Sequence, residues 1–443
     1  MFRFLGTTCV VCLVLSVSCP VAAAPPATRP AEATFYKDVL PILQKHCQGC
    51  HRPGEPAPMP LLTYEGVRPW GKAIRQAVLR KSMPPWFADP HAGRFTNDRS
   101  MPQADIDTLA GWVDAGAPAG DPNQAPQPLT FTDGWAIGKP DLIVEIPEAI
   151  SVPASGTVEY TYVIVPTGLT EDKWVQMAEA RPDQRAQVHH IIAFVRQPGS
   201  KWFRQYPIGK PFIPGKGGDG NGRGEFLTGY APGSPPEILR PGQAKLLKAG
   251  SEIVFQMHYT ANGKPVSDRS RAGLVFATAP VRQRVLTLAA SNDKFVIPPG
   301  APNHRVDGAI TLRRDGELVS LMPHMHLRGK AMEISAVYPG GEREMLLRVP
   351  RYDFNWQLWY QLPPGKRLPA GTRIEASGYF DNSPNNKSNP DPAAAVRYGD
   401  QSWEEMMFGF FDVAIDAAMN PAELLREPAR SAARPAALGS GGQ

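Results

Sequence analysis

The hydrophobic pattern of the sequence changes near residue 130, and this change limits the folds that the chain can adopt. Between Phe35 and Trp112, apolar residues recur at helical spacing. Beyond Leu129, short runs of alternating apolar and polar residues are separated by turn residues. The 48 prolines, about twice the average usage, also disfavour long helices. We therefore predict a multidomain chain, with a small all-α domain followed by all-β antiparallel sandwich domains.

The β-rich region is too long for one sandwich of about 100 residues, so we place a division between Leu288 and Pro299. The predicted organisation is a signal peptide in 1–24, an all-α domain in 32–118, a Pro- and Ala-rich linker in 119–130, β-sandwich domains in 131–290 and 291–427, and a disordered tail in 428–443. Gly217–Gly224 follows no predicted strand and lacks the Gly-Lys-Ser/Thr ending of a phosphate-binding loop, so we interpret it as a surface loop.

The N-terminus has the features of a secretory signal peptide. Met1–Leu5 lead into an apolar stretch, and Ala22–Ala24 supply the small residues that precede a cleavage site. We therefore expect a periplasmic or secreted protein. A lipid anchor on Cys19 is disfavoured, because Ser16 stands where a lipoprotein signal carries a large aliphatic residue. No later segment has the length and apolarity of a membrane span.

Cysteine content and charge narrow the class further. Cys9, Cys12 and Cys19 would leave with the signal peptide, so the mature chain would keep two of the five cysteines and no spare thiols for disulfides. Stability must then come from large cores, for which the 42% hydrophobic content is sufficient. The formal net charge of +5 is spread over many loops, which gives no support for nucleic-acid binding.

The two remaining cysteines belong to Cys47-Gln48-Gly49-Cys50-His51, a c-type haem attachment motif. Two thiols separated by two residues can bind both vinyl groups of haem, and the adjacent histidine then becomes an axial iron ligand. Half of a zinc site is the alternative, but no second Cys pair completes a zinc tetrahedron. We predict one covalent haem c in a helical region the size of a small cytochrome c.

The second axial ligand is expected to be a thioether, as in electron carriers. Met83 is our choice, because the prolines after it fix an extended loop and Trp86 can cover the haem edge. Met59, Met101 and His91 remain alternatives. Met101 lies just before the last predicted helix, where a role in packing would be enough to explain a methionine.

Two histidine groups have strand-like spacing. His324 and His326 are two residues apart, so on a strand both imidazoles point to one face and can bind one metal. In Glu252–Tyr259, apolar residues alternate with Gln256 and His258, which therefore share a face. A single histidine of this kind is often only a core residue. The presence of other strand histidines in the chain is what indicates metal binding.

The pair His189–His190 has a different spacing, because neighbours on a regular strand face opposite ways. Both can bind one ion only if the strand bends or ends there. Five of the nine histidines thus fall on or beside predicted strands in three clusters. This is more than we expect if the histidines had only structural roles.

These clusters resemble the copper type II, ascorbate-dependent monooxygenases, the family of peptidylglycine alpha-hydroxylating monooxygenase and dopamine beta-monooxygenase. The matching pieces within about residues 130 to 420 are Val188-His189-His190, Gln256-Met257-His258-Tyr259, His324-Met325-His326 followed closely by a glycine, and Glu404-Glu405-Met406. The resemblance implies two jelly-roll-like copper domains.

The resemblance also implies the ligand sets. His189, His190 and His258 would form an electron-transfer copper site in the first sandwich domain, and His324, His326 and Met406 would form an oxygen-binding copper site in the second. Three imidazoles suit copper in either oxidation state, whereas a thioether favours copper(I), the state that meets dioxygen. Met406 is preferred to Met407 because it follows Glu405.

The chain departs from the peptide-amidating members near the second site. Where those enzymes are expected to carry an arginine and two polar residues, this chain has Met322, Phe408 and Phe410. A substrate carboxylate would be buried without partners, which is costly, so a more apolar substrate is expected.

The sequence therefore predicts an exported monooxygenase that hydroxylates an aliphatic C–H bond of a small-molecule or peptide-like substrate with O2. The fused haem would take electrons from a periplasmic donor or a small reductant and pass them singly to the His189/His190/His258 copper, with Gln256 ordering the intervening water. The alternative is a non-catalytic haem and copper protein for electron transfer or copper handling. Haem peroxidase chemistry, a third possibility, requires an open iron position.

Overall fold

A computed structural model describes residues 33–55, 57–131, 134–215 and 224–425 of the chain. The predicted signal peptide, the predicted disordered tail and all of the predicted Gly-rich loop except Gly224 lie outside these residues. Within the described ranges, the helices are too short or too polar to cross a membrane.

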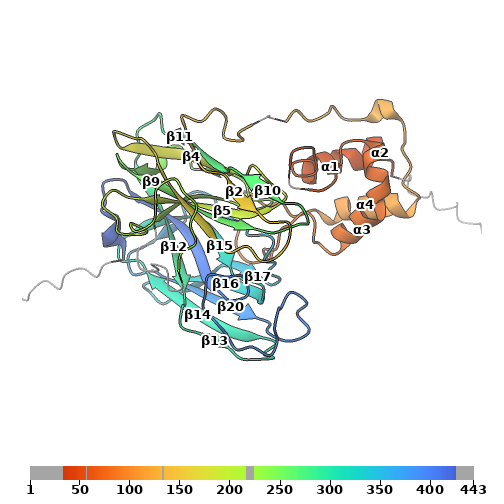
Figure 1. The fold of residues 1–443 in the computed structure, drawn as a ribbon. Helices are drawn as coiled ribbons and strands as arrows, with labels where there is room; N and C mark the ends of the chain where they lie inside the picture. Colours follow the sequence, from red (N-terminus) through yellow and green to blue (C-terminus); the bar gives the residue numbers. More distant parts are fainter. Residues whose placement is uncertain (1–32, 56, 132–133, 216–223, 426–443) are drawn as a thin grey trace, which may run out of the picture.

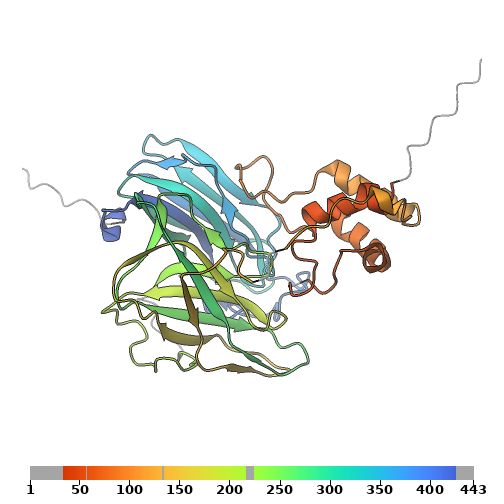
Figure 2. The ribbon, with the colours of Figure 1, turned by 90° about the horizontal axis from the view of Figure 1, so that it is seen from above.

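The longer helices lie together in the N-terminal part, to one side of the sheets in both views of the ribbon (Figures 1 and 2). They pack around a core that includes the fully buried side chains of Phe35, Leu43, Leu109 and Trp112. The apolar spacing predicted helices in this region, and they are present. They are the π-helical turn η1 (Phe35–Val39), α1 (Leu40–His46), α2 (Tyr64–Val67), the 3₁₀ turn η2 (Arg68–Trp70), α3 (Gly71–Leu79) and α4 (Gln103–Asp114). Two further 3₁₀ turns are η3 (Pro122–Gln124) and η4 (Pro421–Leu424).

The remainder of the described chain is mostly β-sheet, as the alternating pattern predicted. The strands of the first half are β1 (Leu142–Glu145), β2 (Ile150–Val152), β3 (Thr161–Pro166), β4 (Lys173–Arg181), β5 (Val188–Arg196), β6 (Glu225–Tyr230), β7 (Glu237–Ile238), β8 (Gln243–Leu247), β9 (Glu252–Tyr259), β10 (Val266–Asp268) and β11 (Arg271–Phe276). Those of the second half are β12 (Gln283–Ser291), β13 (Val296–Ile297), β14 (His304–Thr311), β15 (Gly316–His324), β16 (Gly329–Val337), β17 (Arg343–Val349), β18 (Tyr360–Gln361), β19 (Arg367–Leu368), β20 (Arg373–Phe380), β21 (Val396–Arg397) and β22 (Phe408–Asp416).

Each half has two packed sheets, an arrangement consistent with β-sandwich domains. A ten-stranded sheet has the order β1-β11-β4-β8-β12-β22-β15-β18, with β7 and β19 at its side. In the first half, the four-stranded sheet β3-β9-β5-β6 shares a core with strands of this large sheet. In the second half, β14-β20-β16-β17 packs on the large sheet around a second core.

The two halves are joined by the large sheet itself. The parallel pairing of β8 with β12 connects them, with Gln283 opposite Gln243 and Arg284 opposite Ala244. β12 then pairs along its whole length with β22 of the second half. The division that we placed between Leu288 and Pro299 begins inside β12.

Residues that follow the third helix leave the helical part and cover the second half. Phe87 belongs to the core of that half, and Trp86 and Phe95 pack against it. The backbone amide of Asp89 donates to the carbonyl of Arg348, and the amide of Thr96 donates to that of Gln361. The helical part is therefore attached to the β-rich part by this segment as well as by the chain that leads into β1.

Candidate metal centres

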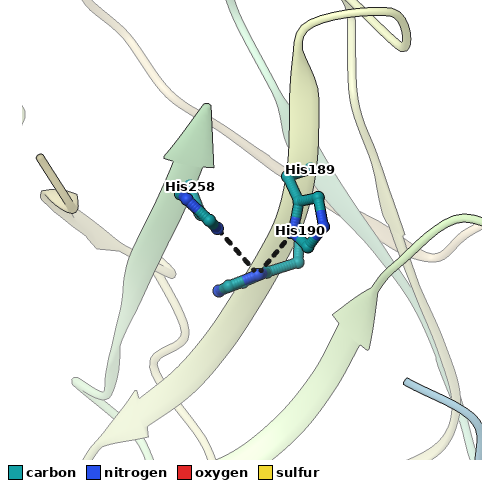
Figure 3. A group of neighbouring side chains, drawn as sticks. All are labelled: His189, His190 and His258. Carbon is teal, nitrogen blue, oxygen red and sulfur yellow. Dashed lines mark hydrogen bonds between the residues drawn. The ribbon is translucent and has the colours of Figure 1, made fainter. Parts of the chain in front are cut away.

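Three imidazoles converge on the outer face of the sheet β3-β9-β5-β6. The core-facing residues of β9 are Ile253, Phe255, Met257 and Tyr259, so His258 points away from the core, as the alternation predicted. His190 lies directly opposite His258 as its Cα partner on β5. Both rings therefore lie on the same sheet face (Figure 3).

A β-bulge brings His189 to the same point. The register of β5 against β9 shifts between Val188 and His190, which leaves His189 as the extra residue. This is the strand irregularity that the neighbouring histidines required. One potential ligand atom from each of His189, His190 and His258 lies within 4.8 Å of the other two.

The spacing of these nitrogens fits a metal ion. The Nδ1 atom of His190 is 3.3 Å from the Nδ1 atoms of both His189 and His258. Metal–nitrogen bonds of about 2.0–2.1 Å in a tetrahedral arrangement separate the nitrogens by about 3.3 Å. The residues present therefore fit a metal that prefers imidazole ligands, a group that includes copper and zinc.

The electrostatics of the first cluster also suit metal binding. Burial lowers the pKa of His189 to about 4 and that of His258 to about 3. Burial also lowers the pKa of His190 well below its usual value, and the charges of His258 and His189 act in the same direction. All three rings are then neutral at pH 7, which is the form that binds metals.

The second histidine pair lies at the end of β15, on the face of the large sheet that is turned away from the core of the second half. The ring centroids of His324 and His326 are 5.3 Å apart. β15 ends at His324, so His326 lies beyond the strand and the strand-face argument does not apply to it. Its position depends instead on contacts with neighbouring loops.

Those contacts orient both rings. The Nδ1 atom of His324 is 2.8 Å from Oε1 of Gln357, and the Nδ1 atom of His326 is 3.3 Å from the carbonyl oxygen of Glu404. In each ring a hydrogen bond at Nδ1 leaves Nε2 as the nitrogen with a lone pair. The Nε2 atom of His326 is buried and has no hydrogen-bond partner within the described part of the chain. A metal ligand is one physical reason for such an atom.

The backbone around His326 is held by buried side chains. The carboxylate of Glu405 accepts hydrogen bonds from the amides of His326 at 2.8 Å and Arg328 at 2.6 Å. The hydroxyl of Tyr352 donates to the carbonyl of Met325 at 2.7 Å and accepts from its amide at 3.1 Å. Burial raises the pKa of Glu405 to about 8, and the two amides partly offset this effect.

The two methionines after Glu405 have different surroundings. Met407 is fully buried in the core of the second half, with its side chain against Gly308 and Gly378. Met406 is 8% exposed and does not belong to that core. It lies two residues before Phe408, the Cα partner of His324, and its role as a ligand in preference to Met407 stays a prediction.

The two histidine clusters, one in each half, face each other where the halves meet. The charges of His324 and His326 contribute to lowering the pKa of His190, and His258 contributes in the same way at His326. Tyr160 packs edge-on against His190 and His258, and its hydroxyl is hydrogen-bonded to Ser402 of the second half.

The haem motif lies just after α1. The amides of Cys50 and His51 both donate to the carbonyl of Cys47, and neither cysteine forms a disulfide. The Nδ1 atom of His51 lies 3.1 Å from the carbonyl oxygen of Met59, a hydrogen bond that leaves Nε2 for a metal. The motif therefore fits a haem with His51 as an axial ligand.

The candidates for the second axial ligand are spread over the helical part. Met59 and Met101 pack against the helical core. Met83 is half-buried in the loop after α3, and His91 is exposed. Met83 as the sixth ligand remains a prediction.

Sequence reasoning missed the loop between β17 and β18, which supplies Tyr352, Phe354 and Gln357 to the second cluster. The Gln256 amide donates to the Tyr162 hydroxyl, and its role with water stays a prediction. The motif Arg351-Tyr352-Asp353-Phe354 is rich in aromatic and charged residues, but spacing alone could not connect it to histidines that lie about 30 or 160 positions earlier.

Comparisons with known proteins do not identify a family. No family model and no curated protein matches the chain. Among solved structures, allantoicase from Saccharomyces cerevisiae is 7% identical, with a TM-score of 0.16, over 59% of this chain and 80% of that one. The infectious bursal disease virus VP2 subviral particle is 10% identical, with a TM-score of 0.17, over 67% and 77%. PNGF-II is 11% identical, with a TM-score of 0.22, over 62% and 60%.

Proposed function

We propose that the chain is an exported, copper-dependent monooxygenase that hydroxylates an aliphatic C–H bond, with electrons supplied through a fused haem c. The observation that carries the proposal is the convergence of three neutral imidazoles, His189, His190 and His258, within 4.8 Å. The second pair, His324 and His326, lies opposite them and includes a buried nitrogen without a partner among the described residues. Two such clusters in the same chain as a haem motif suit a reaction that consumes two electrons.

The finer architecture belongs to the same proposal. The helical part would be a small cytochrome c domain, and the two β-rich halves would be jelly-roll-like sandwich domains, each holding one copper. The resemblance to the copper type II monooxygenases supports this assignment. The partners would be O2, an apolar substrate, and a periplasmic electron donor or small reductant.

The ligand sets follow from the geometry and the resemblance together. His189, His190 and His258 would hold one copper, and His324, His326 and Met406 the other. Cys47, Cys50, His51 and Met83 would hold the haem. When bound, these groups supply one-electron transfer and the activation of O2, so that R–H, O2, two electrons and two protons give R–OH and water.

The chain's own residues prepare both sites. Burial lowers the pKa of His189, His190, His258 and His326 and so keeps these four rings neutral. The contacts of Gln357 and Glu404 fix which nitrogen of His324 and His326 would face the metal. The thioether of Met406 would favour the reduced metal.

The surface beside His324 is apolar. Phe408 and Phe410 stack on each other with ring centroids 5.1 Å apart, and lie 6.2 and 6.0 Å from the His324 ring. Met322 is the Cα partner of Phe410 and lies on the same sheet face. These side chains would hold an apolar part of a substrate against the second cluster.

Metal analysis and oxygen uptake test the proposal. The mature wild-type protein should contain one haem and two coppers, and should consume O2 when the haem is reduced and a suitable C–H donor is present. His324→Ala should abolish this uptake without changing the haem spectrum. His304→Ala, which changes a strand histidine outside both clusters, is the control. If the coppers exchange electrons but no C–H donor supports uptake by the wild type, the protein is an electron relay.

A further inference from the structure

One aromatic ring lies between the two histidine clusters. Phe354, in the loop between β17 and β18, stacks on His189 with a centroid distance of 5.0 Å and an interplanar angle of 18°. The same ring lies 5.9 Å from the centroid of His326 and meets it edge-on at 79°. One side chain thus contacts a ring from each cluster.

We propose that Phe354 is a positioning residue that couples the two clusters electronically, by filling the space between His189 and His326 with a ring rather than with water. This inference rests on the proposed function, because it concerns metals held by those histidines. A third contact, 6.5 Å from the His258 centroid, places the ring beside a second member of the first cluster. The Nε2 atom of His189 is buried, out of contact with bulk solvent.

The loop that carries Phe354 is fixed on both sides of the ring. Before it, the Tyr352 hydroxyl holds both polar backbone groups of Met325, between His324 and His326. After it, the Gln357 side chain bonds the His324 ring, and the Gln357 carbonyl accepts from the hydroxyl of Ser234 in the first half. A loop anchored in this way holds its aromatic side chain in one place.

The same loop also reaches the helical part. The guanidinium of Arg351 donates to the carbonyls of Arg80 at 2.9 Å and Lys81 at 2.6 Å, and lies over the ring of Phe87. Arg80 and Lys81 come shortly before Met83, the predicted axial ligand. Arg351, which contacts the helical part, and Phe354, which contacts His189, are separated by only two residues. One short segment therefore joins the regions of all three predicted redox centres.

The proposed step is a single-electron exchange. With metals bound, one electron would pass from the His189/His190/His258 site to the His324/His326 site, and dithionite or the physiological donor would supply its replacement. No bond of Phe354 forms or breaks, and the ring gains no proton. Because the large sheet joins the two halves, the fold sets the distance between the clusters. The ring of Phe354 determines what fills the space between them.

The test uses the full-length holoprotein and measures electron exchange rather than turnover. After anaerobic mixing with dithionite, rapid freeze-quench EPR follows the loss of each copper(II) signal. In the wild type we expect both signals to disappear together. Phe354→Leu keeps an apolar side chain but removes the ring. In this variant we expect the copper(II) signal of the second cluster to disappear later than that of the first. In Phe354→Tyr, which keeps the ring, the two signals should again disappear together.

Controls separate the possible failures. Phe95→Leu removes a comparable ring that packs on Trp86 and Tyr360, away from both clusters, and should behave as the wild type. Copper content is measured for every variant. If the wild type binds fewer than two coppers, the proposed function and this inference both fall. If two coppers are bound and Phe354→Leu loses both signals together, or Phe95→Leu produces the same lag, this inference alone is overturned.

Discussion

Tyr352→Phe is the most informative single change, because it removes one hydroxyl and no charge. That hydroxyl satisfies both the amide and the carbonyl of Met325, whose side chain is fully buried. Each hydrogen bond contributes about 1 kcal/mol, and a buried backbone group left without a partner costs about 1–3 kcal/mol. We therefore expect the free energy of unfolding to fall by about 2–4 kcal/mol.

The same change should weaken metal binding at the second cluster. Met325 lies between His324 and His326, and His326 lies outside regular strand structure, so its position depends on such contacts. Loss of a group that orients metal ligands typically costs about 10- to 100-fold in affinity. Urea denaturation measures the stability, and a copper titration followed by EPR measures the affinity of each site. The first cluster should retain its copper.

Tyr360→Phe is the matched control. Tyr360 is 1% exposed, lies in the core of the same half, and hydrogen-bonds the backbone of Phe87. Its loss should lower stability but leave both copper affinities unchanged. This role of Tyr352 is refuted if the unfolding free energy of Tyr352→Phe is within about 0.5 kcal/mol of the wild type, a change typical of surface substitutions, or if both variants weaken the second site equally.

Three further changes test other parts of the structure. His258→Ala should reduce the copper content from two per chain to one, measured by elemental analysis, because only two imidazoles remain in the first cluster; an unchanged content would contradict the ligand assignment. Burial raises the pKa of Glu237 to about 7, so the folded state favours the protonated form. The resulting contribution to the free energy of unfolding is fully present below pH 4.5 and is lost as the pH rises through about 7. Glu237→Gln should therefore show a smaller fall in unfolding free energy between pH 5 and pH 8, by on the order of 3 kcal/mol; parallel pH profiles would exclude this explanation. Gly409→Ala should destabilise the protein by about 1–3 kcal/mol, because a Cβ at that position would lie 2.7 Å from the Cβ of Ala376. Gly340→Ala, where a Cβ meets nothing within 4 Å, is the control, and equal thermal stability of the two variants would argue against close packing.

Much of the secondary structure could be predicted from local pattern. The alternation in Glu252–Tyr259 predicted both the strand and the outward face of His258, because side chains alternate between the faces of a strand. The helices followed in the same way from apolar residues at helical spacing. These predictions succeeded because each depends on residues that are close in sequence.

Other features depend on contacts that the sequence does not display. Adjacent histidines required an irregular strand, but only the pairing with β9 shows that a bulge at His189 supplies it. His326 appeared to share a strand with His324, yet β15 ends before it. Its orientation comes from Glu404 and Glu405, almost 80 positions later. Such long-range partners cannot be read from a single sequence without an independent indication of contact.

The connection between the two halves has a consequence for how electrons would move. Besides the β8–β12 pairing, the side chain of Arg240 bonds Glu317, and that of Gln243 bonds Gln283. Shared sheet hydrogen bonds and partly buried ion pairs oppose a hinge motion between the halves, because opening would leave backbone groups unpaired. Both histidine clusters lie on sheet faces turned away from their own cores, so the surface between the halves is where they meet. If the clusters hold metals as proposed, this fixed connection would favour electron exchange across a constant distance over repeated domain closure. The side chain of Phe354, which lies between the clusters, would then influence how readily electrons pass.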